Sequence, residues 1–95
     1  MIRIMTATKR NVTTITVDGC VIAEYTETID AVVKQAIERG GPVHLFLRDV
    51  STIDESGRAL LRGLVGKRVR LSAAGVYCSY VVAGINRSAT HPQAA

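Results

Sequence analysis

The side chains best placed for chemistry lie in residues 49–57, which read DVSTIDESG. Asp54 and Glu55 are neighbouring carboxylates, and Ser56 follows them directly. Two carboxylates can work as general acid and base, and a serine becomes a nucleophile when a base activates it. Neighbours on a helix point about 100° apart, however, so these carboxylates would not face one substrate. No His is close to Ser56 in sequence, and the GxSxG pattern is absent. We therefore expect no catalytic residue here and no enzyme activity.

The remaining reactive groups are isolated from one another. His44 has no second His, Cys or carboxylate at a ligand's spacing, and Cys20 and Cys78 lack the CxxC pattern. The glycines before Lys67 complete neither GxxxxGK[ST] nor GxGxxG. We expect free thiols that pack as small hydrophobic groups, and neither a metal nor a cofactor.

The same nine residues also make a good start for a helix. Asp54 can accept hydrogen bonds from the free N–H groups of a first helical turn, and Glu55 adds favourable negative charge there. Gly57 does not fit this explanation, because glycine weakens a helix by about 1 kcal/mol relative to alanine. A glycine at this position predicts that another backbone packs closely, or that the surface is kept flat for a partner.

Hydrophobic patterning predicts the elements around this corner. Residues 1–7 and 12–17 read as a hairpin of two strands, with Asp18 and Gly19 ending the second. Residues 26–41 show a helical stripe that Thr26 or Thr28 could cap, and the GGP at 40–42 ends it. Then follow a buried strand at 43–50, a helix at about 55–66, a strand at 69–75 and a segment at 76–85. For that last segment we choose a helix, with a stripe of Val76, Tyr80, Val81 and Gly84.

This order of elements, β-β-α-β-α-β-α, predicts the α/β class. Strand–helix–strand repetition implies a mixed, mostly parallel four-stranded sheet with about three helices. We expect a single domain over residues 1–86 and a flexible polar tail over residues 87–95.

Charge is distributed unevenly along the 95 residues. The net charge is +4, and the last 40 residues carry six Lys or Arg but no acid. That asymmetry leaves nucleotide or nucleic-acid binding open as an alternative, although no nucleic-acid-binding motif is present and we do not expect such a partner. No signal peptide or apolar run of about 18 residues occurs, so we expect a cytoplasmic protein without membrane insertion.

The stretch VHLFLRDVSTIDESGRALLRGL resembles the core of a STAS domain, the fold of bacterial anti-sigma factor antagonists and of the cytoplasmic tails of sulfate transporters. The resemblance covers about residues 10–83. In signalling members of that family, a partner kinase phosphorylates the Ser or Thr that follows the family's Asp. Here Asp54 matches that Asp, Gly57 matches the family glycine, and Glu55 occupies the phosphoacceptor position. The resemblance therefore implies a regulatory domain without the usual phospho-switch. Ser56 or Ser51 is an alternative acceptor, although the favoured interpretation is an ordinary serine at a helix start.

The function that this resemblance implies is the non-enzymatic docking of a signalling partner, such as a kinase-like anti-sigma factor. The expected partner-binding residues are Ser51, Thr52, Asp54, Glu55, Ser56, Gly57, Arg58 and Arg62. An alternative is an accessory subunit of a lipid-trafficking ABC transporter, whose partner would be the transporter ATPase. The chain is shorter than is usual in the family, so its last strand would be exposed and could pair with a second copy in a homodimer.

Overall fold

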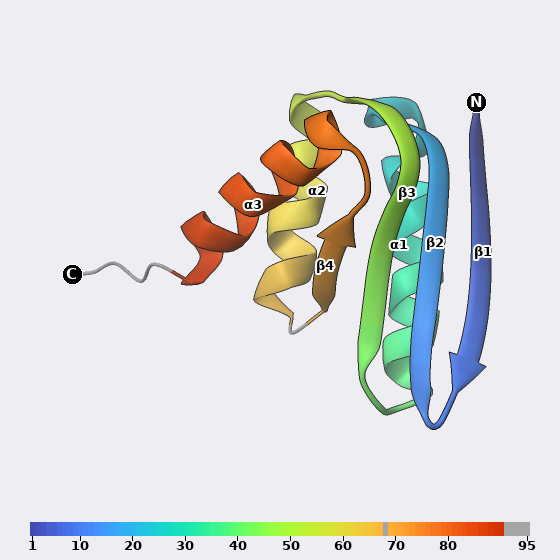
Figure 1. Cartoon of the computed structure of the whole chain (residues 1–95). Helices are drawn as coiled ribbons and strands as arrows, with labels where there is room; N and C mark the ends of the chain where they lie inside the picture. Colours follow the sequence, from blue (N-terminus) through green and yellow to red (C-terminus); the bar gives the residue numbers. More distant parts are fainter. Residues whose placement is uncertain (68, 91–95) are drawn as a thin grey trace.

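Strands and helices alternate along the chain after an opening hairpin (Figure 1). The computed structural model describes residues 1–67 and 69–90. In this part of the chain the elements are β1 (Ile2–Lys9), β2 (Val12–Val21), α1 (Ala23–Glu38), β3 (Val43–Ile53), α2 (Glu55–Gly66), β4 (Arg70–Ala73) and α3 (Val76–Thr90). The predicted α/β class, with four strands and three helices, is confirmed for the described residues.

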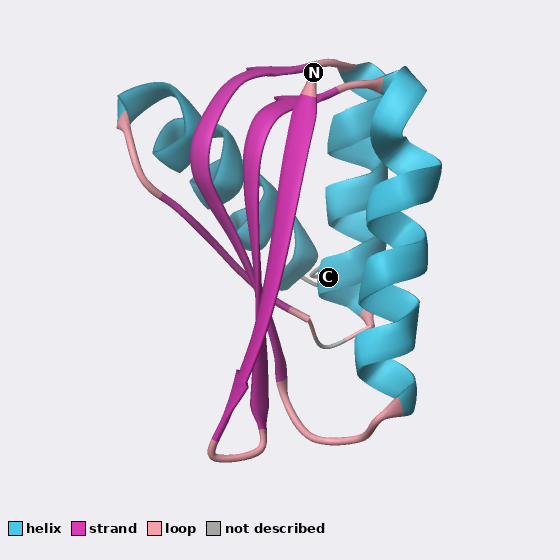
Figure 2. Cartoon of the chain, turned by 90° about the vertical axis from the view of Figure 1, so that its right-hand side faces the viewer, coloured by secondary structure: helices cyan, strands magenta, loops and turns pink. Residues whose placement is uncertain are grey.

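The four strands form one mixed sheet in the order β1-β2-β3-β4. β1 pairs antiparallel with β2, while β2–β3 and β3–β4 are parallel. Figure 2 shows α1 and α2 side by side on one face of this sheet, while α3 runs obliquely behind the strands and packs against β4 and α2. Both crossover helices lie on the same face because each connects neighbouring parallel strands with the same hand.

The hairpin forms as predicted, but its strands are longer. Lys9 pairs with Val12, and the turn residues Arg10 and Asn11 have φ values of 53° and 70°. Two positive φ values are typical of the tight turn whose twist suits a hairpin. The prediction that Asp18 and Gly19 end the second strand is wrong, because β2 continues through them to Val21.

The core lies between the sheet and the pair α1 and α2. Alternate residues of β2 and β3 point into it, since successive side chains on a strand face opposite ways. The apolar side chains that are fully excluded from solvent include Ile15, Val17, Leu45, Leu47, Val33 and Leu61. α2 spans the predicted residues, and its buried positions are Gly57, Leu61 and Leu64.

α3 confirms the choice of a helix for residues 76–85 and continues to Thr90. A tail therefore does not begin at residue 87, and residues 91–95 lie outside the described residues. The predicted stripe is wrong in two of its four positions: Val76 is 91% exposed and Tyr80 is 78% exposed. The residues that α3 buries are Cys78, Val81, Val82 and Ile85.

α3 also covers the outer edge of β4. The Ser79 hydroxyl donates to the carbonyl of Ala73 at 3.3 Å, and the Asn86 amide donates to the carbonyl of Leu71 at 3.3 Å. These side chains satisfy carbonyl groups that an edge strand would otherwise present to another chain. The expectation of an exposed last strand is therefore wrong, and β1 forms the other edge of the sheet.

The two cysteines differ in their surroundings, which predicts different reactivity. Cys78 is 2% exposed, and its thiol lies 2.8 Å from the carbonyl oxygen of Val50. Burial raises the pKa of the Cys78 thiol, whereas Cys20 is only half-buried. Because the thiolate is the reactive form, we expect a thiol reagent to modify Cys20 alone in the native protein and both thiols in denaturant. Rapid native modification of Cys78 would contradict this packing.

Candidate functional site

The corner after β3 lies beside the corner after β2. Val21 and Ile53 are partners in the parallel ladder, so the two strands end at the same level. α1 begins at Ala23 and α2 at Glu55, each two residues after the end of its strand. Two helix N-termini therefore stand side by side, and each brings N–H groups that have no partner within its own helix.

A single carboxylate binds both helix starts. Oδ1 of Asp54 accepts from the N–H of Gly57 at 2.8 Å, and Oδ2 accepts from the N–H of Ala23 at 3.0 Å. Asp54 is the N-cap of α2, whereas the N-cap of α1, Ile22, offers no side-chain hydrogen bond. The N–H groups of Gly57 and Ala23, in that order of effect, hold the pKa of Asp54 below its ordinary value. The carboxylate is thus a cap shared by two helices.

This shared cap explains why α1 starts earlier than predicted. The expected cap at Thr26 or Thr28 is wrong, because both residues lie inside α1. The Thr26 hydroxyl instead donates to the carbonyl of Ala23 at 3.0 Å. Since Asp54 supplies an acceptor from a neighbouring corner, α1 needs no polar N-cap of its own.

Gly57 seats the first turn of α2 directly against β2. A Cβ atom at this position would overlap the carbonyl oxygen of Val21 and lie 3.0 Å from both the carbonyl carbon and Cγ1 of Val21. Real Cβ atoms essentially never come as close as that oxygen would be. The prediction that another backbone packs closely on Gly57 is confirmed.

The last part of β3 is irregular, which exposes two neighbouring residues. The β2–β3 register shifts between Val17 and Asp18 and again between Gly19 and Cys20, so β3 holds one extra residue at each shift. The second extra residue is Ser51, and both Ser51 and Thr52 are exposed. Such bulges bend a strand and redirect its side chains, and Figure 1 shows the upper end of β3 curving toward α2. The strand consequently reaches Ile53 instead of ending at residue 50 as predicted.

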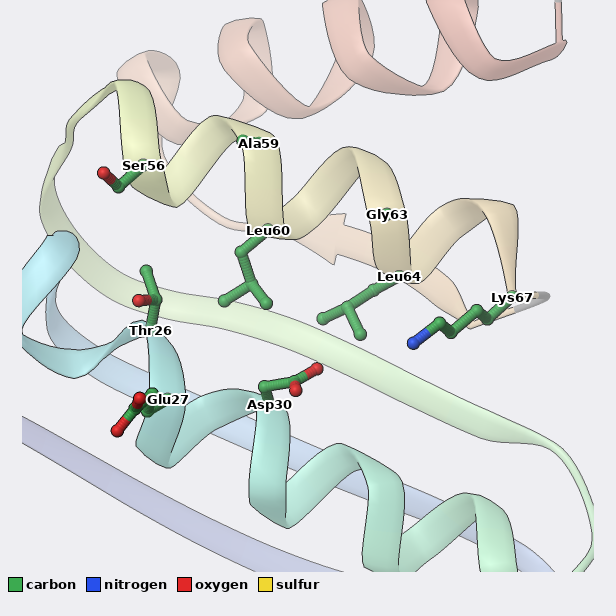
Figure 3. A pocket seen from close by; sticks show the side chains of 9 residues that line it. All are labelled: Thr26, Glu27, Asp30, Ser56, Ala59, Leu60, Gly63, Leu64 and Lys67. Carbon is green, nitrogen blue, oxygen red and sulfur yellow. The ribbon is translucent and has the colours of Figure 1, made fainter.

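Ser56 lies on one side of α2, in the groove that faces α1 (Figure 3). This groove has a volume of about 380 Å³, and Leu60 and Leu64 point from α2 into it. Thr26 and Asp30 line the α1 side. Glu55, in the first turn of α2, is exposed and does not line the groove.

Arg58 and Arg62 lie on the other side of α2, in a cleft of about 300 Å³ that faces α3. The eight predicted partner-binding residues therefore fall into two groups. Ser51, Thr52, Asp54, Glu55, Ser56 and Gly57 belong to the corner, while the two arginines belong to the α2–α3 cleft.

Two tyrosines of α3 extend this region and were missed by the sequence analysis. The Tyr77 hydroxyl lies 3.3 Å from the backbone N and 3.4 Å from the carbonyl oxygen of Ile53, within the corner. Tyr80 lines the α2–α3 cleft and is largely exposed. The signal that could have placed them is Cys78, because a stripe built around this small apolar residue turns both tyrosines outward.

His44 lies away from the corner, at the start of β3. It pairs with Thr14 and Arg70 in the sheet, and its Nε2 lies 2.6 Å from the hydroxyl of Ser72. Burial, and then the charge of Arg70, lowers the pKa of His44. Within residues 1–67 and 69–90, no three His, Cys, Asp or Glu side chains come together as metal ligands would.

Comparison with known proteins assigns no family to the chain. No protein-family model matches the chain, and no curated protein sequence matches it. Among the helices of the described residues, none has the length and apolar character needed to cross a membrane.

Proposed function

We propose that this protein is a STAS-like, non-enzymatic regulatory domain that docks a signalling partner through the corner at residues 51–57. The observation that carries the proposal is the shared cap at Asp54. Because Asp54 fixes the starts of α1 and α2, the exposed residues Ser51, Thr52, Glu55 and Ser56 stand on a backbone that is ordered before a partner arrives. Preorganisation of this kind reduces the entropy that is lost on binding.

The same cap argues against catalysis at the corner. Both oxygens of Asp54 already accept hydrogen bonds from helix N–H groups, which stabilise the ionised form and make it a poor general base. Ser56 and Glu55 extend from neighbouring positions in the first turn of α2 and so diverge by about 100°. A docking surface does not require these two side chains to converge, whereas a nucleophile and its base would have to.

Glu55 gives the docking surface a permanent negative charge at the start of α2. In the STAS regulators that the chain resembles, the residue at this position is phosphorylated, and the removable charge of the phosphate blocks the interface with the partner. We propose that the present domain engages its partner without that switch, and that the partner surface facing Glu55 is basic.

Site-specific photo-crosslinking in cells that express the protein tests the proposed function. A photoreactive residue replaces Ser56 in one variant and Glu38, at the far end of α1, in a matched control. We expect the Ser56 variant to give a discrete crosslinked partner, identified by mass spectrometry, and the Glu38 variant to give none. Glu55→Lys should abolish the crosslinked product, because it reverses the charge that the partner is proposed to recognise.

Two results would contradict the proposal. One is an equal crosslinking pattern from Ser56 and Glu38, and the other is a Ser56 product that Glu55→Lys leaves unchanged. If the crosslinked partner is the ATPase of a transporter, the accessory-subunit alternative replaces the signalling one.

A further inference from the structure

The cleft between α2 and α3 gathers positive charge on both of its walls. Arg58 and Arg62 come from α2, and Arg87 comes from α3. The ion pairs Lys34–Asp30 and Arg48–Asp18 involve neither Arg58 nor Arg62. No acidic residue follows Glu55 in the sequence, so both walls are built almost entirely from a segment without carboxylates.

Folding alone does not favour this arrangement. Arg58 and Arg62 are four residues apart on one helix face, where like charges repel each other. Within the described part of the chain, no hydrogen bond or ion pair is found for either guanidinium group. Two guanidinium groups that line one cleft are suited to an anionic ligand, since guanidinium matches carboxylate or phosphate geometry.

The aromatic and apolar surroundings indicate a protein segment as the ligand. Tyr80 lines the cleft and is 78% exposed, and Val76, one turn earlier on α3, is 91% exposed. Exposed tyrosine beside arginine is the composition of binding hot spots between proteins. A nucleic acid would need a basic stripe that extends beyond the cleft. Toward the corner, however, the next charged residues of the chain are the acidic Glu55 and Asp54.

We infer that the α2–α3 cleft binds an acidic segment of the docked protein, in an extended conformation with carboxylates at alternate positions. Arg58 and Arg62 are separated by about 6 Å along the helix axis, from a rise of 1.5 Å per residue. Alternate residues of an extended strand are separated by about 7 Å and point the same way. One guanidinium group can therefore meet each carboxylate, while Tyr80 contacts the peptide between them. The inference rests on the proposed function, because α2 forms both the corner and one wall of the cleft.

A titration of the ¹⁵N-labelled 95-residue chain followed by NMR tests the inference. The probe is a capped hexapeptide of alternating Asp and Ala, and the control is the matching Asn and Ala peptide. We expect only the Asp peptide to shift the backbone amides of Arg58, Arg62, Tyr80 and Gly84, with a dissociation constant of about 1 mM or tighter. The affinity should fall as salt is added, because the contacts are between charges.

Variants connect this binding to the two arginines. The double variant Arg58→Gln/Arg62→Gln should bind the Asp peptide at least about tenfold more weakly, since two charge-assisted contacts are lost. Arg39→Gln, which removes a positive charge at the far end of α1, should bind as the wild type does. Equal weakening by Arg39→Gln would show non-specific attraction and overturn the inference.

Three further outcomes would also overturn it: no saturable shift from the Asp peptide, equal binding of the Asn peptide, or tighter binding of a thymidine hexanucleotide at the same residues. These failures are separable from a failure of the proposed function. If Ser56 crosslinks to a partner but the Asp peptide does not bind, the acidic ligand of the cleft is rejected and the corner stays the proposed docking site. If the Asp peptide binds but Ser56 gives no crosslink, the corner is rejected as a docking site.

Discussion

Gly57→Ala is expected to destabilise the protein, although alanine is the better helix former. Helix propensity alone would give the variant about 1 kcal/mol of extra stability. The new methyl group, however, would overlap the carbonyl oxygen of Val21, which belongs to the backbone and cannot turn aside as a side chain can. Overpacking against a rigid neighbour costs about 1–3 kcal/mol or more. We therefore expect a net loss of about 1–2 kcal/mol in the free energy of unfolding, measured with urea.

Gly63→Ala is the matched control for this prediction. Gly63 lies in the same helix, and an added Cβ there would meet no atom within 4 Å. The substitution should stabilise the protein by about 0.5–1 kcal/mol. Opposite signs for two Gly→Ala changes in one helix would separate the close packing at Val21 from helix propensity. If both substitutions stabilise the protein equally, the close contact at Gly57 is refuted.

Asp54→Asn is expected to lower the free energy of unfolding at neutral pH, although Asn is as good an N-cap as Asp in general. Asn has one acceptor oxygen, which can serve the N–H of Gly57 and so keep the cap of α2. Its amide group would then turn toward the N–H of Ala23 and leave that donor without an acceptor. The start of α1 should therefore be weakened, as urea unfolding would show. An unchanged stability would mean that Asp54 caps α2 alone.

Asp30→Asn controls for the loss of one negative charge on α1, here in the middle of the helix. Asp30 pairs with Lys34 at 3.0 Å, four residues later on the helix surface. Pairs of this kind contribute only about 0.2–0.5 kcal/mol, so the substitution should have little effect. A loss as large as that of Asp54→Asn would assign the effect to charge and not to the shared cap.

The stabilisation by Asp54 should depend on pH in a defined direction. The pKa of Asp54 in the folded protein lies below its ordinary value of 3.8, because N–H groups stabilise the carboxylate. The stabilisation is then complete well above pH 3.8 and is lost as the pH falls through the lower, folded value. The difference in unfolding free energy between wild type and Asp54→Asn should therefore shrink below about pH 4. A difference that grows on acidification would contradict the assigned hydrogen bonds.

The local features of the corner could be predicted from sequence because each depends on a few neighbouring residues. Asp54 precedes a helical pattern, which is sufficient to predict a cap. Gly57 has low helix propensity within that pattern, which is sufficient to predict a close contact. The shared role of Asp54 could not be predicted, since Ala23 lies 31 residues away. It requires β2 and β3 to end at the same level, and that depends on the register and on two bulges in β3.

The region around α3 shows a second limit of sequence patterns. Val76 and Tyr80 fit a helical stripe as well as Cys78 and Val82 do, and periodicity alone does not choose between two phases of one helix. Contacts with the edge of β4 make the choice, because Ser79 and Asn86 must face that strand. The consequence is functional as well as structural, since the chosen phase places Tyr80 in the cleft with Arg58 and Arg62.

Residue-resolved hydrogen exchange tests most directly the central claim that one carboxylate orders the docking corner by holding the starts of two helices. The amide protons of Ala23 and Gly57 are compared in the wild type, Asp54→Asn and Asp54→Ala. We predict that both protons are protected in the wild type, that Asp54→Asn loses protection at Ala23 but keeps it at Gly57, and that Asp54→Ala loses both. Equal exchange of the Ala23 proton in the wild type and in Asp54→Ala would contradict the claim.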